Sequence, residues 1–304
     1  MILASWRYLL VMLYYRVTRP LRKMTSPELS VLRKTIEFFS PFNRPPSDAN
    51  QDYEDIEGVN TLITNWGDQK PEAVFLYIHG GGFSLCSPKT HSNLMAHLSR
   101  YAHALVYGPA YSLSPEQKFP TALAECELVF NEIKKRHPGL KVFVGGDSAG
   151  GNLAAALCHL LKRKGEKGPD GLVLLSAWLD LRRDFSSMKQ NRKKDSVFDV
   201  EDLEDYAKRY CEEDQRDDPL VSPLLADPDS FPPVLIQATK NEFLFTDSEL
   251  LAQKLKEANR PVKTQYYDKL FHAWQAFPNF MPEAKDAIKK IGDFVEGTSN
   301  KDES

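Results

Sequence analysis

The chain has 304 residues, 42% of them hydrophobic and 27% charged, which suffices for one large α/β domain or two small ones under a solvated surface. Its net charge of −3 gives no overall attraction to nucleic acid, and no basic stripe interleaved with aromatic residues appears. The four cysteines lie far apart without a Cys-x-x-Cys pair. Their spacing excludes the usual zinc and disulfide patterns and favours a reducing, cytoplasmic compartment.

The N-terminal segment predicts an amphipathic helix. Apolar residues recur in it at helical spacing, at Leu3, Trp6, Leu10, Leu13 and Val17, and basic residues gather at its end, at Arg16, Arg19, Arg22 and Lys23. The uncharged run 8–15 is too short to span a bilayer, which needs roughly 18 apolar residues, and no signal-peptide cleavage site follows it. Two interpretations stay open: the helix packs on the protein's own surface, or residues 1–23 lie on a membrane as a basic interfacial helix.

Further along the chain, apolar runs rich in β-branched residues alternate with helical patterns. The apolar runs predict strands at 73–79, 104–111, 141–146, 171–178, 233–240 and 262–268. The patterns between and after them predict helices at 90–101, 120–136, 152–164, 247–259 and 282–296. Near-continuous apolar strands separated by helices predict a mostly parallel central sheet with helices on both faces.

Two regions break this alternation. The pattern of residues 1–50 predicts a helix followed by the proline-rich sequence SPFNRPPSD. Residues 182–217 are rich in charged side chains, with a helix predicted at 199–211. The second region alone is compatible with a solvated surface insertion. Together the two segments can form a helical cap over the end of the sheet where ligands of open α/β sheets bind. This divides the chain into an N-terminal cap segment (1–50), a core (51–181), a cap insertion (182–217) and further core (218–304).

One serine stands among four glycines in the sequence VGGDSAGGN at 144–152. The pentapeptide GDSAG follows a predicted strand and opens a predicted helix. Such a sharp reversal strains the backbone, projects the serine hydroxyl above the sheet edge and aims helix N–H groups toward it. A phosphate-binding turn is the alternative, but neither a G-x-G-x-x-G motif nor a P-loop lysine is present. Ser148 is therefore the candidate nucleophile, and we expect Asp147 to support the turn.

An attacking serine also needs hydrogen-bond donors for the oxyanion that it creates. The sequence YIHGGGFSL at 77–85 places three consecutive glycines directly after a predicted strand. Without Cβ atoms in the way, the backbone N–H groups of Gly81 and Gly82 can turn inward, and that of Ala149 completes a three-donor oxyanion hole. We expect His79 to brace this loop by hydrogen bonding, with a buried structural histidine as the alternative.

These motifs resemble the hormone-sensitive-lipase family of α/β-hydrolases. The sequences HGGGF at 79–83 and GDSAGGN at 146–152 carry the resemblance. Further matching segments are SAWLDL (176–181), DPLVSPL (218–224) and AYSLSPEQKFP (110–120). In the last of these, Ser112 and Ser114 stand where the family usually has Arg and Ala. The resemblance implies the α/β-hydrolase fold with a helical cap, hydrolysis of carboxylic esters, and no metal or cofactor.

His272 is the candidate general base. It lies in a loop between the last predicted strand and the C-terminal helix, at the sheet edge where an α/β-hydrolase holds a histidine beside its nucleophile. The family resemblance implies the same position. Outside the glycine loop, the remaining histidines fall on predicted helices or their ends, at His91, His97, His103, His137 and His159.

Two carboxylates compete for the role of triad acid. Glu242 follows a predicted strand and stands in an acid-x-Leu pattern with Leu244, where the family carries Asp or Glu. Asp247 is the alternative, although its position before the sequence SELLAQKL suits a helix N-cap. Either carboxylate would orient His272 and stabilise its imidazolium. The chain order Ser, acid, His and the matching pattern favour Glu242.

The sequence thus predicts a serine carboxylesterase that acts on a small-molecule ester with a short or medium acyl chain. It predicts no cofactor, metal or nucleic-acid partner, and it leaves a homodimer open. A lactonase, or a deacetylase of lipids or arylamides, would use the same triad and is an alternative. A non-catalytic ligand-binding protein on the same fold is another, but the histidine at position 272 argues against it.

Overall fold

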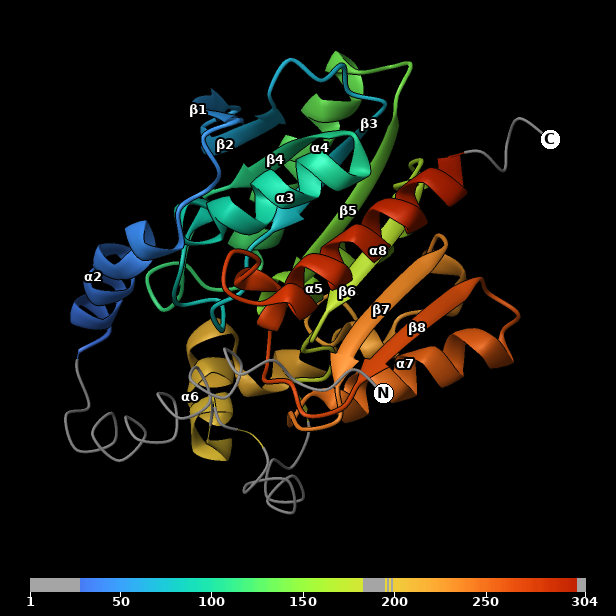
Figure 1. The fold of residues 1–304 in the computed structure, drawn as a ribbon. Coiled ribbons are helices and arrows are strands. Elements are labelled where there is room, and N and C mark those ends of the chain that lie inside the picture. Colours follow the sequence, from blue (N-terminus) through green and yellow to red (C-terminus); the bar gives the residue numbers. More distant parts are fainter. Residues whose placement is uncertain (1–27, 183–194, 196, 198, 300–304) are drawn as a thin grey trace.

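A computed structural model describes residues 28–182, 195, 197 and 199–299 of the chain. An eight-stranded sheet with the strand order β1-β2-β4-β3-β5-β6-β7-β8 forms its centre (Figure 1). The strands are β1 (Ala49–Ile56), β2 (Val59–Trp66), β3 (Ala73–Ile78), β4 (Ala104–Pro109), β5 (Lys141–Asp147), β6 (Gly171–Leu175), β7 (Val234–Thr239) and β8 (Val262–Tyr267). All pairs among β3 to β8 are parallel, which confirms the mostly parallel sheet predicted from the sequence.

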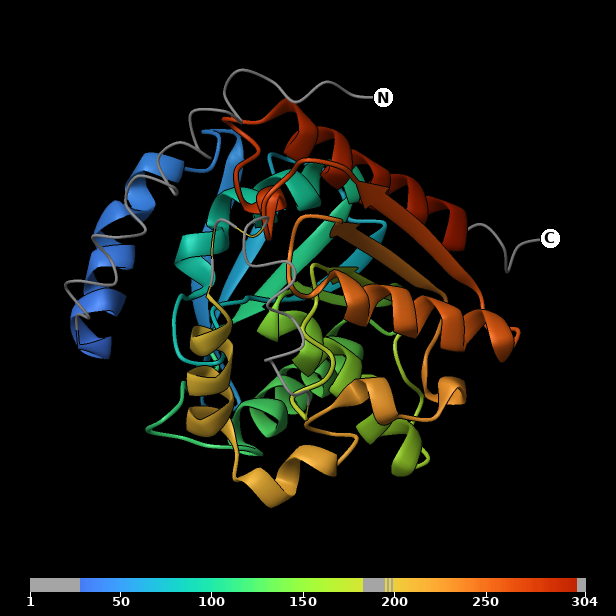
Figure 2. The same cartoon turned by 90° about the horizontal axis from the view of Figure 1, so that it is seen from below.

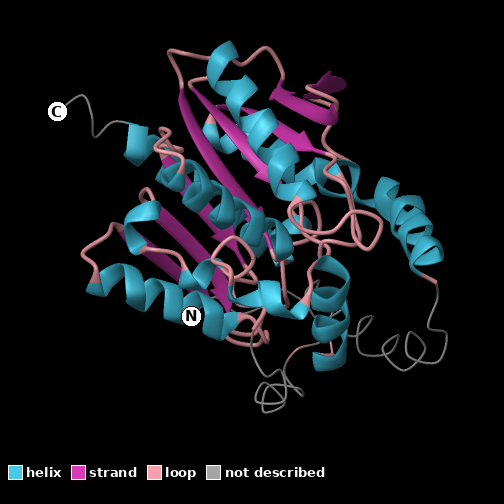
Figure 3. Cartoon of the chain, turned by 180° about the vertical axis from the view of Figure 1, so that it is seen from behind, coloured by secondary structure: helices cyan, strands magenta, loops and turns pink. Residues whose placement is uncertain are grey.

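Helices cover both faces of this sheet (Figure 3). They are α3 (Ser92–Ala102), α4 (Thr121–Arg136), α5 (Ala149–Arg163), α7 (Phe245–Glu257) and α8 (Pro282–Ser299). Successive side chains of a strand point to opposite faces. In β3, Val74 and Leu76 belong to the core layer that contains α4, α5 and α7, whereas Phe75 and Tyr77 belong to the layer that contains α3 and α8. The layered α/β-hydrolase architecture follows from this alternation of buried strands and amphipathic helices.

The hairpin formed by β1 and β2 was not predicted from the sequence. The two strands pair antiparallel, and β2 continues antiparallel onto β4. Their connection is a two-residue turn in which Glu57 and Gly58 both have positive φ, 52° and 86°, as a tight hairpin requires. β1 exposes most of its polar side chains, so it lacks the apolar run that identifies buried strands. Charged residues on such an edge strand also discourage pairing with another chain.

Two further helices, α2 (Leu29–Phe39) and α6 (Val200–Tyr210), belong to the segments outside the alternating pattern. Both contact the loop that follows β3. Arg33 of α2 donates a hydrogen bond to the carbonyl of Ser84, and the ring of Tyr206 in α6 lies against Gly82. The two helices thus lie at the end of the sheet where the sequence predicts a cap (Figure 2). The helix predicted within residues 1–23 falls outside the described residues.

None of the helices in the described ranges combines the length and the apolar composition that a membrane span needs.

Candidate active site

Ser148 occupies a strained turn between β5 and α5. Its φ of 52° and ψ of −122° lie in a region that residues with a Cβ rarely adopt. The turn is fixed by backbone hydrogen bonds: the Ser148 amide donates to the Leu175 carbonyl at 2.9 Å, and the Ser148 carbonyl accepts from the Trp178 amide at 3.1 Å. A Cβ on Gly150 would overlap the Ile78 carbonyl, so the helix can approach β3 only with glycine there. The predicted strand–serine–helix reversal is present.

His272 and Glu242 form a buried hydrogen-bonded pair. The Nδ1 atom of His272 lies 2.6 Å from Oε2 of Glu242, and the two residues are 6% and 0% exposed. The other carboxylate oxygen, Oε1, accepts from the Thr239 amide at 3.0 Å, which anchors Glu242 to the end of β7. An imidazole held through Nδ1 by a carboxylate has its tautomer and orientation fixed, as a general base requires.

The end of β6 brings the His272 loop and the Ser148 turn to the same place. Leu175, the last residue of β6, accepts the Ser148 amide. The next residue, Ser176, accepts the Ala273 amide through its hydroxyl at 3.3 Å. Consecutive residues of one strand end thus hold the nucleophile and the residue after His272, so both lie at the carboxyl edge of the sheet.

Glu242 also determines the protonation behaviour of His272. Burial by itself lowers the pKa of His272, but the hydrogen bond and the negative charge of Glu242 raise it above its ordinary value of 6.5. The carboxylate therefore favours the imidazolium, the form that arises when a histidine takes a proton from an attacking serine.

Asp247 does not contact His272 through any hydrogen bond between described residues. Its Oδ2 accepts the backbone amides of Leu179 and Asp180 at 2.8 and 3.0 Å. The expectation that Asp247 caps α7 is wrong, because the helix begins at Phe245 and Asp247 lies within its first turn. From there the side chain points to the loop after β6. Of the two candidate acids, the fold brings Glu242 to His272.

The glycine loop after β3 forms a tight turn. Gly81 and Gly82 have positive φ values of 115° and 59°, and the Gly81 carbonyl accepts the amides of Ser84 and Leu85 at 3.1 and 2.9 Å. Among the described residues, the amides of Gly81, Gly82 and Ala149 donate no hydrogen bond. These three N–H groups are thus available to a ligand.

His79, which was expected to brace this loop, and Asp147, which was expected to support the Ser148 turn, both contact it. Oδ1 of Asp147 accepts the Gly80 amide at 2.9 Å and the Tyr77 hydroxyl at 2.7 Å. His79 stacks on Tyr111 with ring centroids 4.3 Å apart, and its Nδ1 lies 2.8 Å from the Gly80 carbonyl. Burial, together with the charge of His91, lowers the pKa of His79 to about 3. A neutral His79 fits a bracing role.

His91 is a residue of this site that the sequence did not single out. Its Nε2 lies 3.4 Å from Oδ1 of Asp147, and both side chains are buried. Burial would raise the pKa of the Asp147 carboxyl, but the charge and hydrogen bond of His91, with the donors Tyr77 and Gly80, hold it at about 2. Burial lowers the pKa of His91, and Asp147 more than offsets this, so the His91 pKa is raised. A buried histidine–carboxylate pair therefore lies beneath the glycine loop.

Helix α6 packs two aromatic rings on the glycine loop, and neither was singled out from the sequence. A Cβ on Gly82 would lie 2.7 Å from the Tyr206 ring. One helical turn on, Tyr210 stacks on Phe83 with ring centroids 3.7 Å apart. The spacing of these two tyrosines, i and i+4, was the available signal that one helix face is apolar.

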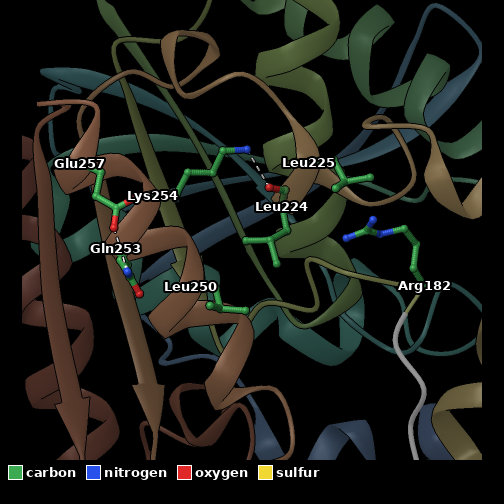
Figure 4. A pocket seen from close by; sticks show the side chains of 7 residues that line it. All are labelled: Arg182, Leu224, Leu225, Leu250, Gln253, Lys254 and Glu257. Atoms are coloured by element: carbon green, nitrogen blue, oxygen red, sulfur yellow. Dashed lines mark hydrogen bonds between the residues drawn. The ribbon is translucent and has the colours of Figure 1, made fainter.

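Two surface hollows of the described structure lie away from Ser148. One, of about 300 Å³, is a groove between α7 and the segment around Leu224 (Figure 4). Another, of about 480 Å³, adjoins Leu128 of α4. Ser148 is only 6% exposed, so the candidate nucleophile is almost buried. In the described ranges, no three His, Cys, Asp or Glu side chains gather in the manner of a metal site.

Comparison with known proteins agrees with this geometry. A family model described as "alpha/beta hydrolase fold" matches residues 75–276. An esterase of Acinetobacter venetianus is 36% identical over 226 residues, which are 73% of this chain and 74% of that protein. An acetyl-hydrolase of Streptomyces hygroscopicus is 29% identical over 297 residues, covering 90% of this chain and 97% of the relative.

Solved structures extend the agreement to the whole fold. The crystal structure of an esterase from the bacterial hormone-sensitive lipase family superposes with a TM-score of 0.89 at 28% identity, over 98% of this chain and 100% of the other. A hormone-sensitive lipase from a metagenome library gives a TM-score of 0.88 at 26% identity, over 96% and 98% of the two chains. The chain belongs to the hormone-sensitive-lipase family of α/β-hydrolases and is a hydrolase of the carboxylesterase type.

Proposed function

We propose that this esterase cleaves carboxylic esters with short or medium acyl chains through an acyl-enzyme formed on Ser148. The observation that carries the proposal is the 2.6 Å hydrogen bond between His272 and Glu242, at the sheet edge that also holds Ser148. This arrangement supplies a nucleophile, a base and an orienting acid in the chain order of α/β-hydrolases.

In the first half of the reaction, Nε2 of His272 takes the proton of the Ser148 hydroxyl as Oγ bonds to the ester carbonyl carbon. The carbonyl π electrons move to oxygen and produce a tetrahedral oxyanion. When this intermediate collapses, the C–O bond to the alcohol breaks and the alcohol leaves with the proton from His272. Water then attacks the acyl-enzyme with the same base, which releases the acid and restores Ser148.

The amides of Gly81, Gly82 and Ala149 are the proposed donors to the oxyanion. Their lack of other partners in the described chain supports this role. Removing one donor from an oxyanion hole typically lowers the rate about a hundredfold or more. His79 and Asp147 would then act by holding the loop in shape rather than by touching the substrate.

A small acyl group suits the closed site. Ser148 is almost buried, and the ring of Tyr206 in α6 packs against Gly82 of the glycine loop. Among similar proteins, one is named an acetyl-hydrolase and another an acetyl esterase. The division of the chain into two core parts and a cap made of residues 1–50 and 182–217 belongs to the same proposal.

The test is hydrolysis of p-nitrophenyl esters from acetate to palmitate by the full chain, with S148A in parallel. We expect the highest kcat/KM at acyl chains of two to about eight carbons and loss of activity in S148A. Activity that persists in S148A would contradict the proposal. A folded wild-type chain that hydrolyses a lactone or an arylamide but no ester would favour those alternatives, and binding without turnover would indicate a ligand-binding protein.

Peripheral membrane contact through residues 1–23 is the partner proposal, in an otherwise cytoplasmic protein. The 27 residues that precede the described part contain five basic and no acidic residues. The adjoining helix α2 exposes Val31, Phe38 and Phe39 by 50%, 73% and 56%, as an interfacial surface would. The full chain should co-sediment with vesicles containing phosphatidylglycerol, and the chain without residues 1–23 should stay in the supernatant.

Light scattering after size exclusion tests whether the chain forms a homodimer.

A further inference from the structure

Arg33 of the cap helix α2 reaches the end of the glycine loop. Its Nε donates to the Ser84 carbonyl and its Nη2 to the Ser114 carbonyl, both at 2.8 Å. The same guanidinium binds the carboxylate of Glu116 through two hydrogen bonds, at 2.7 and 2.8 Å. One side chain thus connects α2 to two segments, around Ser84 and around Ser114, that lie 51 and 81 residues further along the sequence.

The two carbonyls belong to a unit built around the glycine turn. The Ser84 amide closes the turn by donating to the Gly81 carbonyl. The Ser114 amide donates to the Phe83 carbonyl at 2.8 Å, and the hydroxyls of Ser84 and Ser114 lie 2.7 Å apart. Both serines are buried, at 0% and 1% exposure. A displacement of either carbonyl is therefore transmitted to the turn that contains Gly81 and Gly82.

Polar contacts hold α2 in place on this side. No residue of α2 is buried, so the helix lacks the apolar anchor that fixes most surface helices. Glu37, one turn after Arg33, hydrogen-bonds the Ser87 hydroxyl and lies 3.8 Å from Lys89. The position of α2 and the position of the loop are thus determined by the same few contacts.

The ion pair between Arg33 and Glu116 contributes little to holding the glycine loop. Glu116 has a side chain that is 60% exposed, and exposed ion pairs contribute little because water screens them. The hydrogen bond from Arg33 lowers the pKa of Glu116 to about 2, so Glu116 stays charged and keeps the guanidinium oriented. The partly buried bonds to the two carbonyls are what fix the loop.

We propose that Arg33 is a positioning residue for ester hydrolysis: from the cap helix it holds the carbonyls of Ser84 and Ser114, and thereby orients the amides of Gly81 and Gly82 toward the oxyanion. The proposal rests on the proposed function, since it assigns Arg33 a role in that reaction. Because an oxyanion exists only in the transition state and the intermediates, the effect should appear in kcat and leave KM nearly unchanged.

The experiment compares R33A, R33K and E116Q in the full chain on p-nitrophenyl acetate. For R33A we expect kcat to fall about tenfold, less than the loss of a whole donor, with KM within about twofold. R33K keeps the charge but lacks the fork that reaches two carbonyls, so it should lose nearly as much. E116Q keeps only one acceptor for the guanidinium, the amide oxygen, but it leaves the two carbonyl bonds of Arg33 in place, so its kcat should fall much less than that of R33A.

Arg136 of α4 offers a matched control. It also forms ion pairs at the surface, with Glu54 at 2.7 Å and Glu132 at 3.0 Å, but none of these partners belongs to the glycine loop. R136A should therefore leave kcat unchanged. Circular dichroism and thermal unfolding establish that each variant is folded, and R33K carries the test if R33A does not fold.

A second readout separates positioning from a general loss of structure. When a trifluoromethyl ketone binds, the Ser148 oxygen adds to its carbonyl carbon, the serine proton passes to His272, and an oxyanion remains in the same site. Its inhibition constant should rise in R33A by the factor by which kcat/KM falls. A folded R33A with wild-type kcat, an unchanged inhibition constant, or an equal loss in R136A overturns this proposal alone. An inactive wild-type chain, or an active S148A, overturns the proposed function and this proposal with it.

Discussion

Two buried histidine–carboxylate pairs lie at the same edge of the sheet and invite comparison. His272 pairs with Glu242 at 2.6 Å, and His91 pairs with Asp147 at 3.4 Å. Both histidines are 6% exposed, and in both the carboxylate raises the histidine pKa against the effect of burial. By local chemistry alone, either pair could serve a nucleophile.

Their carboxylates differ in what else they bind. One carboxylate oxygen of Glu242 binds His272 and the other accepts the Thr239 amide, so the oxygen that binds the histidine has no second partner among these groups. Asp147 uses Oδ1 for Tyr77, Gly80 and His91 together. The histidine is therefore only one of three groups that share this oxygen, and the Gly80 amide of the glycine loop is another. A catalytic role thus depends on where the pair lies relative to the nucleophile and on whether the carboxylate is dedicated to the histidine.

The most severe test of this comparison removes each histidine in turn. H272A should lower kcat about 10⁴-fold or more, since loss of the base inactivates the whole triad. H91A leaves the triad intact and disturbs only the support of the loop, so about a tenfold loss is expected. Steady-state hydrolysis of p-nitrophenyl acetate measures both. Equal losses would mean that the two pairs do not have different roles.

Replacing the two carboxylates sharpens the distinction. E242Q should lower kcat about 10³- to 10⁴-fold, because the amide cannot stabilise the imidazolium or enforce its tautomer, while the melting temperature changes little. D147N should lower the melting temperature more than E242Q, because a neutral amide weakens the hydrogen bonds that Asp147 accepts from both Tyr77 and Gly80. Kinetics and thermal unfolding of the same preparations give both quantities. A D147N variant less active than E242Q would reverse the assignment of the triad acid.

Asp247 provides a third carboxylate against which Glu242 can be judged. D247A leaves the amides of Leu179 and Asp180 without their acceptor, which should reduce the free energy of unfolding by about 1–3 kcal/mol. Because Asp247 is not bonded to His272, kcat should fall far less than in E242Q. Urea denaturation and initial rates measure the two effects. A loss of activity as large as that of E242Q would restore Asp247 as the acid.

The smallest expected effect is a shift of the pH profile. Hydrolysis needs neutral His272, so kcat/KM should rise as pH increases through its pKa, which Glu242 raises above 6.5. In E242Q the hydrogen bond and charge of Glu242 are gone and burial remains, so the residual activity should rise at a lower pH than in the wild type. H91A should keep the wild-type inflection. An unchanged inflection in E242Q would show that Glu242 does not act on the catalytic histidine.

The strands and helices of the core were predictable because each carries its own pattern. Their observed ends lie within about three residues of those expected. The hairpin was missed for the opposite reason, since β1 is an exposed edge strand whose polar side chains resemble a loop. The one local signal was the Glu57-Gly58 pair, whose positive φ values permit a two-residue turn.

The residues of the candidate site also differ in whether the sequence could predict them. Ser148, the glycine loop and His272 could be selected from the sequence, because each follows a predicted strand. In addition, a strained turn or a run of glycines has few uses outside an active site. Arg33 and His91 could not, because neither belongs to a local motif. Their significance comes from partners that are distant in the chain, Ser114 for Arg33 and Asp147 for His91.

The sequence by itself determined the layered fold, the strained serine turn and the histidine that follows the last strand, because these depend on the hydrophobic period and on local backbone restrictions. Only the tertiary structure decided which of the two carboxylates contacts His272. Glu242 and Asp247 are five residues apart, but Glu242 lies in the turn before α7 and Asp247 in its first turn, so they bind different loops. Hydrogen bonds between distant segments form only once the sheet has brought strand ends together, so no pattern along the chain can specify them.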